Sequence, residues 1–206
     1  RGLVGSEMCI RDSHLHILKV LQNIVHPPSL DITSFKDSPI FWQKFKNFIV
    51  KMQNSGYVIG GAMTDVKGDR SLAPNEQSDP DLYVHITKRT RNGVYISGAK
   101  AHQTGCINSH WMIVMPTIRL GEKDKDYAIV GAVPTDAKGI TYIYGRQSCD
   151  TRSLDEGDMD VGNAKFAGQE AMVIFDNVFI ANDDIFLDGE YEFCLLYTSP
   201  SPRDLS

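Results

Sequence analysis

The sequence predicts an α+β fold in which helices come before a compact β-barrel or β-sandwich. Apolar residues recur at helical spacing up to residue 56, and beyond that point they gather in short runs rich in β-branched and aromatic residues. Close spacing of such runs is typical of a barrel or sandwich. The predicted strands are residues 82–87, 94–99, 111–118, 127–133, 140–144 and 171–180.

Two helices are predicted before residue 56. Apolar residues at helical spacing fill residues 14–25, and the prolines that follow end this segment because proline disfavours helical backbone in the residue before it. The second helix begins at Ser38-Pro39, a good N-cap and first-turn pair, and ends at Gly56, which suits a left-handed cap. Its apolar stripe is expected to face the core: Phe41, Phe45, Phe48, Ile49 and Met52.

Both ends of the chain look foreign to the protein. Residues 3–13 can be encoded by one strand of a transposase adapter used for sequencing libraries, and the reverse complement of that strand encodes residues 194–203 in another frame. Opposite strands of one oligonucleotide rarely encode two chain ends by chance. We therefore expect residues 1–13 and 194–206 to be translated adapter, and we exclude them from the predicted fold.

Charge and cysteine content exclude several classes of protein. The chain carries 21 basic and 26 acidic residues, a net charge of −5, and this mild acidity without a basic stripe argues against nucleic acid as a partner. Cys9 and Cys194 lie in the adapter-like ends, which leaves Cys106 and Cys149, too few for a disulfide framework. No apolar run approaches a membrane span. We expect a reduced, cytoplasmic protein with small buried thiols.

Two polar motifs are candidate ligand contacts. Residues 60–70 are predicted as a glycine-bracketed loop that offers flexible backbone, one hydroxyl, mixed charges and a guanidinium that matches phosphate geometry. Residues 98–105 are predicted as a strand. Strict alternation would place Lys100, His102 and Thr104 on one face of it. Each motif alone is also consistent with a surface turn or an ordinary polar strand face.

Together with residues 142–152 and 175–180, these motifs resemble the 4-hydroxyphenylacetate 3-hydroxylase family of flavoproteins, and most closely its 4-hydroxybutyryl-CoA dehydratase branch. The resemblance implies the acyl-CoA dehydrogenase fold. Residues 14–56 would be the end of the N-terminal helical domain and residues 57–193 the flavin-binding middle β-domain. Residues 175–180 resemble the last strand of that β-domain. The C-terminal helical bundle of the fold is expected to be missing.

The resemblance also implies the site residues. Thr104 is expected near the reactive ring nitrogen of FAD, where its hydroxyl would tune the cofactor. Glu170 matches a glutamate on the substrate side and is the candidate catalytic residue, with a surface glutamate that caps the strand as the alternative. The expected FAD contacts are Met63, Thr64, Asp65, Val66, Lys67, Gly68, Asp69, Arg70, His102, Gln103 and Thr104.

The dehydratase branch implies a second cofactor, a [4Fe-4S] cluster held by three cysteines and one histidine. These ligands are expected upstream of residue 14 and beyond residue 193, so no metal ligand is assigned within the chain. The implied reaction converts 4-hydroxybutyryl-CoA to crotonyl-CoA by a radical mechanism, with vinylacetyl-CoA isomerase activity. The partners implied are an acyl-CoA substrate and further copies of the chain in a cytoplasmic homotetramer, without nucleic acid or membrane.

Two alternatives remain open. The wider family includes reduced-flavin monooxygenases of the 4-hydroxyphenylacetate 3-monooxygenase type, which hydroxylate phenolic rings with oxygen and a partner reductase. The chain by itself could also be a non-catalytic β-domain, because much of the flavin's surroundings would lie in the missing bundle and the exposed face would favour aggregation. The acidic segment at residues 155–160 lacks the spacing of an EF-hand and is interpreted as a solvated loop.

Overall fold

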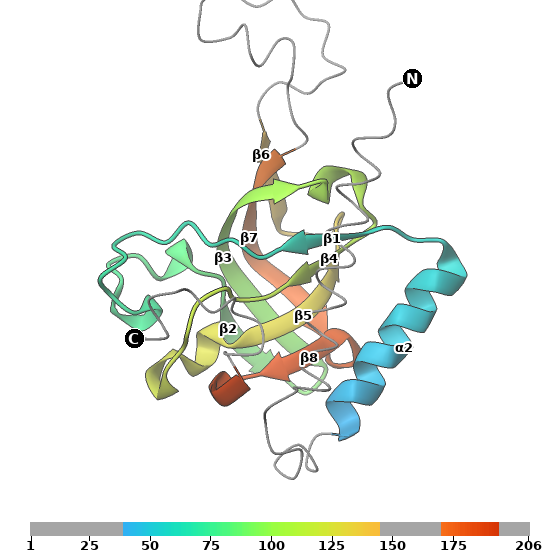
Figure 1. Ribbon diagram of the computed structural model, residues 1–206, viewed down its shortest axis with the longest axis horizontal. Helices are drawn as coiled ribbons and strands as arrows, with labels where there is room; N and C mark the ends of the chain where they lie inside the picture. Colours follow the sequence, from blue (N-terminus) through green and yellow to red (C-terminus); the bar gives the residue numbers. More distant parts are fainter. Residues whose placement is uncertain (1–38, 145–169, 194–206) are drawn as a thin grey trace, which may run out of the picture.

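The computed structural model describes residues 39–144 and 170–193. The predicted helix at residues 14–25, the acidic segment at residues 155–160, Cys149 and both adapter-like ends lie outside the described residues. Where the chain is described, it forms one α-helix and two four-stranded sheets (Figure 1). The predicted combination of a helix with many short strands is confirmed. No helix of this part is both long and apolar enough to cross a membrane.

The strands form two sheets, and in each sheet some neighbouring strands are not consecutive in the sequence. Sheet A has the order β1-β4-β5-β8, with β1 parallel to β4 and the other pairs antiparallel. Sheet B has the order β2-β3-β7-β6 and is antiparallel throughout. The elements are α2 (Pro39–Ser55), β1 (Ile59–Ala62), β2 (His85–Thr90), β3 (Gly93–Thr104), β4 (Trp111–Val114), β5 (Ile129–Pro134), β6 (Ile140–Tyr144), β7 (Glu170–Ala181) and β8 (Ile185–Asp188).

Most predicted strands are present, with changes at their ends. The strand predicted at residues 140–144 matches β6, while β3 and β7 extend beyond the predicted runs. Two strands were not predicted, β1 and β8. The prediction that residues 175–180 form the last strand is wrong, because β8 follows and pairs with β5.

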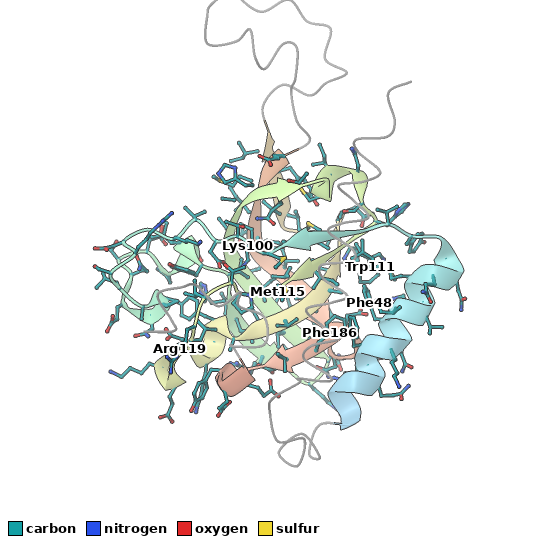
Figure 2. All side chains as sticks on the ribbon, viewed as in Figure 1. Phe48, Lys100, Trp111, Met115, Arg119 and Phe186 are labelled. Atoms are coloured by element: carbon teal, nitrogen blue, oxygen red, sulfur yellow. The ribbon has the colours of Figure 1, made fainter. Side chains whose placement is uncertain are left out.

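The helix α2 packs its predicted stripe against sheet A. Phe45, Phe48 and Met52 are buried, and Gly56 has φ of 64°, the left-handed cap that the sequence predicts. The side chain of Phe41 lies outside the described part. Figure 2 shows Phe48 beside aromatic rings of the sheet: its ring centroid lies 5.6 Å from that of Trp111 and 5.5 Å from that of Phe186. The stripe is therefore core, as expected.

Sheet A is buried on both faces, whereas sheet B has one face open. On β4, Met112 and Val114 join the cluster shared with sheet B, while Ile113 joins the cluster shared with α2. This explains the uninterrupted apolar run of this strand, because both faces are covered. On β7, buried and exposed residues alternate, so one face of sheet B contacts the core and the other contacts solvent.

A β-bulge in β7 explains the motif at residues 175–180. Ile96 pairs with Val178 and Gly98 pairs with Phe175, so two residues of β7 lie opposite one of β3. One of the two is Asn177, which has φ of 50° and whose backbone N–H donates to Ser97 Oγ at 3.0 Å. The bulge keeps both Phe175 and Val178 in the core.

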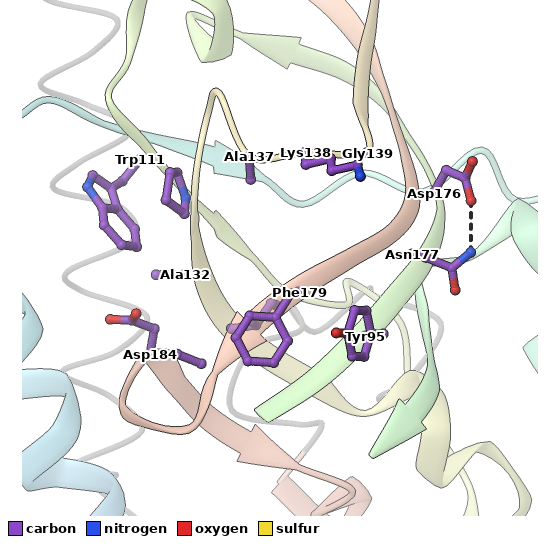
Figure 3. Close-up of a pocket in the computed structure, with 13 residues that line it drawn as sticks. Tyr95, Trp111, Ala132, Ala137, Lys138, Gly139, Asp176, Asn177, Phe179 and Asp184 are labelled. Carbon is purple, nitrogen blue, oxygen red and sulfur yellow. Dashed lines mark hydrogen bonds between the residues drawn. The ribbon is translucent and has the colours of Figure 1, made fainter. Parts of the chain in front are cut away.

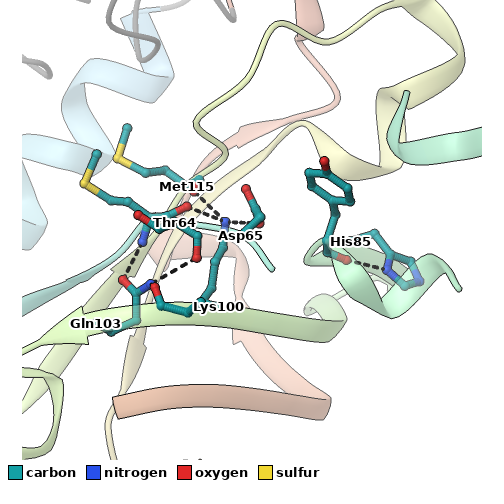
Figure 4. Close-up of polar contacts among 9 residues, drawn as sticks. Thr64, Asp65, His85, Lys100, Gln103 and Met115 are labelled. Atoms are coloured by element: carbon teal, nitrogen blue, oxygen red, sulfur yellow. Dashed lines mark hydrogen bonds and ion pairs between the residues drawn. The ribbon is translucent and has the colours of Figure 1, made fainter. Parts of the chain in front are cut away.

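A buried lysine connects the two sheets. Lys100 on β3 is 1% exposed, and its ammonium donates to Asp65 Oδ1 at 2.5 Å, to the Met63 carbonyl at 2.9 Å and to the Met115 carbonyl at 2.8 Å (Figure 4). Met63 follows β1 and Met115 follows β4, so one cation of sheet B holds the ends of two strands of sheet A. Burial lowers the pKa of Lys100, and the Asp65 carboxylate opposes this effect.

We expect the substitution Lys100→Met to destabilise the chain by about 3–5 kcal/mol, because it leaves the Asp65 carboxylate buried without its cation. The free energy of unfolding in urea measures the loss. The matched control is Lys125→Met, since Lys125 makes an exposed ion pair with Glu122 at 3.5 Å and should cost less than about 1 kcal/mol. Equal losses in the two variants would show that Lys100 is not a buried anchor.

We expect Gly98→Ala to destabilise the chain by at least about 2 kcal/mol. Gly98 has φ of 124°, and a Cβ there would lie 2.5 Å from the Tyr83 carbonyl oxygen and 2.7 Å from Val84 Cα. Both contacts are to backbone, which cannot move aside as a side chain can. Gly121→Ala is the control, because its Cβ would meet nothing closer than 3.6 Å. Thermal unfolding of both variants tests this; an unchanged midpoint for Gly98→Ala would contradict it.

Candidate functional site

The predicted loop at residues 60–70 lies along the edge of β3. β2 pairs with β3 only as far as Ser97, and beyond that point the segment after β1 takes its place. Asp65 forms an isolated bridge with Lys100, and the Ala101 N–H donates to the Thr64 carbonyl at 2.8 Å. At this end of sheet B the loop therefore takes the edge position that β2 holds at the other end, and the order of segments is loop, β3, β7 and β6.

Gln103 fixes the start of this loop. The side chain is 3% exposed; its Nε2 donates to the Thr64 carbonyl at 3.1 Å and to the Ala101 carbonyl, and its Oε1 accepts from the Met63 N–H at 2.9 Å (Figure 4). Gln103 and Asp65 thus both point inward, and the side chain of each makes polar contacts that join the loop to β3. Two of the residues predicted to contact FAD therefore have buried side chains that shape the loop.

The predicted row of Lys100, His102 and Thr104 on one strand face is wrong. Lys100 and Gln103 are buried, whereas His102 and Thr104 are exposed. The cause is a second irregularity in the pairing of β3 with β7, between Lys100 and Gln103, where His102 takes φ of 56°. An extra residue at a bulge shifts the alternation of side chains by one position. As a result, Lys100 points into the core, while His102 and Thr104 point to the outer face.

The same bulge brings three polar side chains together on the outer face of sheet B, and we call them the His102–Thr104–Glu170 cluster. Thr104 pairs in register with Glu170, the first residue of β7, and its Oγ1 donates to Glu170 Oε1 at 3.1 Å. His102 Nδ1 lies 3.6 Å from Glu170 Oε2. All three are predicted site residues. Their contact was not predicted, because it depends on the pairing of strands far apart in the sequence.

The rest of the loop, residues 66–70, packs against the residues that follow it in the sequence. Lys67 and Gly68 have φ of 78° and 35°, and a Cβ at Gly68 would lie 2.5 Å from Gln77 Oε1. Hydrogen bonds from the N–H and hydroxyl of Ser71, at 2.9 and 2.7 Å, lower the pKa of Asp69. The predicted site residues of the loop whose side chains are exposed are Thr64, Val66, Asp69 and Arg70; Met63 and Lys67 are half-buried.

The glycines that open the motif have a different role from the one predicted. Gly60 and Gly61 belong to β1, not to a flexible loop. A Cβ at Gly60 would lie 2.7 Å from Ser109 Oγ and 3.3 Å from Cys106 Cα, so glycine here lets β1 pack against the turn at residues 106–108. Cys106 is fully buried, as predicted, and burial raises the pKa of its thiol.

The outer face of sheet B combines polar and apolar groups. Beside the His102–Thr104–Glu170 cluster, Met172 of β7 pairs with Ile143 of β6, and they are 36% and 56% exposed. Hydroxyl, imidazole and carboxylate groups next to apolar side chains suit a planar ligand with one polar edge, and the carboxylate can accept or donate a proton. Among the residues that the structure describes, no group of three or more His, Cys, Asp or Glu side chains could hold a metal ion.

A cavity of about 800 Å³ is lined by residues of both sheets (Figure 3). Its walls include the aromatic rings of Tyr95, Trp111 and Phe179. Burial raises the pKa of Asp184, another wall residue, while Lys51 opposes this effect. None of the predicted site residues lines the cavity, so it is separate from the candidate site.

Comparisons with known proteins place the chain in a family. The N-terminal region of 4-hydroxyphenylacetate 3-hydroxylase matches residues 22–187. The 4-hydroxybutyryl-CoA dehydratase/vinylacetyl-CoA-Δ-isomerase of Clostridium aminobutyricum is 55% identical over 154 residues, which are 74% of this chain and 31% of that protein. The oxygenase component of 4-hydroxyphenylacetate 3-monooxygenase from Geobacillus sp. (strain PA-9) is 25% identical over 170 residues, 77% of this chain and 32% of that protein.

Solved structures agree with this assignment. An oxygen-tolerant archaeal 4-hydroxybutyryl-CoA dehydratase from N. maritimus matches with a TM-score of 0.70 and 62% identity, over 80% of this chain and 33% of that one. The oxygenase component of 4-hydroxyphenylacetate 3-monooxygenase complexed with FAD shares the fold, with a TM-score of 0.61 and 23% identity over 75% of this chain and 31% of that one. The chain spans about a third of the length of these relatives. It belongs to the 4-hydroxyphenylacetate 3-hydroxylase family, and residues 22–187 match the N-terminal region of that family.

Proposed function

We propose that the chain is part of a flavin-dependent enzyme that dehydrates 4-hydroxybutyryl-CoA to crotonyl-CoA and isomerises vinylacetyl-CoA. One observation carries the proposal: identity is 55% and 62% to two proteins named as this dehydratase, but 25% and 23% to oxygenase components of the same family. A gap of this size within one fold favours the dehydratase over aromatic hydroxylation. In the whole protein we propose the acyl-CoA dehydrogenase-like arrangement, completed by a C-terminal helical bundle, in a cytoplasmic homotetramer.

The outer face of sheet B is the proposed FAD site. Thr104 offers a hydroxyl for the ring edge, and Arg70, an exposed residue of the loop at residues 60–70, offers a guanidinium that suits the pyrophosphate. Asp65 and Gln103 would act indirectly, because their side chains are buried and hold the loop in place. FAD, when bound, supplies the electron-transfer chemistry of the reaction.

Glu170 is the proposed catalytic residue. Its side chain is 55% exposed in this chain, and its carboxylate accepts a hydrogen bond from Thr104, which leaves further lone pairs for a substrate proton. The proposed radical mechanism also requires a [4Fe-4S] cluster in the whole protein. The described residues offer no ligand set for such a cluster, so no step of the reaction is assigned to it from this chain.

The test is an anaerobic assay of the whole protein that contains this chain. We expect FAD and iron to copurify with it and crotonyl-CoA to form from 4-hydroxybutyryl-CoA. Hydroxylation of 4-hydroxyphenylacetate with oxygen and a flavin reductase is assayed in parallel. Protein that holds both cofactors, yields no crotonyl-CoA and hydroxylates the phenol would replace the dehydratase proposal with the monooxygenase.

In the same protein we expect Glu170→Gln to lower kcat for crotonyl-CoA formation about 100-fold or more, because the amide cannot take up or release the substrate proton. FAD content should stay unchanged, since the substitution keeps the shape of the side chain. Glu122→Gln is the control, as Glu122 is an exposed surface carboxylate outside the site. Equal activity of the two variants would leave Glu170 as a surface glutamate that caps β7.

A further inference from the structure

In the His102–Thr104–Glu170 cluster, a polar group lies near each oxygen of one carboxylate. Thr104 Oγ1 contacts Glu170 Oε1 at 3.1 Å, and His102 Nδ1 lies 3.6 Å from Oε2. The terminal torsion of a glutamate is broad, so a single contact leaves the carboxylate free to rotate. A hydrogen bond to Oε1 and an imidazole near Oε2, both from β3, restrict that rotation. We propose that His102 is a positioning residue that orients the Glu170 carboxylate toward the substrate; this inference rests on the function proposed above.

The backbone of β3 is built to direct His102 toward Glu170. A non-glycine residue with positive φ is uncommon, and His102 has φ of 56°. Buried anchors on either side maintain this conformation: Lys100 with its three acceptors, and Gln103 with its contacts to the loop. Regular alternation would turn His102 inward and Gln103 outward. The bulge therefore turns the imidazole outward, together with Thr104, on the face where Glu170 lies.

Orientation, rather than stability, is the effect that this contact can provide. The side chains of His102 and Glu170 are 78% and 55% exposed, and an ion pair at such exposure contributes little to the free energy of unfolding. A small rotation of a reacting carboxylate, in contrast, changes rate strongly, because proton transfer requires hydrogen-bond geometry. Loss of His102 should thus lower kcat while stability and FAD affinity change little.

The test is a double-mutant cycle in the whole protein loaded with FAD: His102→Leu, Glu170→Gln and both together. We expect His102→Leu to lower kcat about tenfold, with KM and the Kd for FAD, measured by flavin fluorescence, within twofold of the unsubstituted protein. In the Glu170→Gln background the same change should cause no further loss, because there is no longer a reacting carboxylate to orient.

Two further variants sharpen the test. His102→Asn should restore most of the activity, since the asparagine amide nitrogen lies near the position of Nδ1 and asparagine tolerates positive φ. His85→Gln is the matched control. His85 is the first residue of β2, and its Nδ1 also lies near a carboxylate oxygen, 3.9 Å from Asp81 Oδ1. This variant should leave kcat unchanged. Thermal unfolding of each variant confirms that the fold is intact.

Three results would overturn the positioning role alone. Equal weakening of FAD binding by His102→Leu in both backgrounds, or additive losses of kcat, would make His102 a flavin contact that acts without Glu170. Failure of His102→Asn to restore activity would show that the donor at Nδ1 is not what matters. These results leave the proposed function intact. Absence of crotonyl-CoA formation by the unsubstituted protein, in contrast, would overturn the function and the positioning role together.

Discussion

The buried contact between Lys100 and Asp65 is the constraint on which the arrangement of the candidate site depends. An ammonium group without water around it needs acceptors on every side, and Lys100 finds them in Asp65 and in the carbonyl groups of Met63 and Met115. These acceptors follow different strands of sheet A, while Lys100 belongs to sheet B. The other oxygen of Asp65 is buried without a hydrogen-bond partner in the described structure, so its charge is balanced chiefly by Lys100.

The surface cluster follows from this buried contact. Lys100 and Gln103 both point inward, yet they are three positions apart, which an alternating strand cannot achieve. The bulge resolves the conflict, and His102 takes the left-handed conformation that the extra residue requires. Thr104 then faces outward and pairs with Glu170. The exposed groups of the candidate site are thus placed by buried side chains that hold the loop against β3.

The sequence predicts those features that depend on neighbouring residues. The stripe around Phe48 and the β-rich runs are local patterns, and the structure contains them. β1 was missed because Gly60-Gly61 has the composition of a loop, although close packing against Ser109 is what requires glycine. The side of β3 on which His102 lies could not be predicted, because the bulge depends on the contact between Lys100 and Asp65, which are 35 residues apart. The contact between Thr104 and Glu170 joins residues that are 66 positions apart.

The difference between the two sheets explains why the candidate site lies on sheet B. Sheet A contacts α2 on one face and sheet B on the other, so its side chains are used in two cores. Sheet B shares one core and leaves its other face open. On β7 this separates two roles within one strand: Val173 and Phe175 fill the core, while Glu170 and Met172 stay exposed. A strand with this division can change its outer residues, and with them the chemistry it supports, without disturbing the packing that holds it in place.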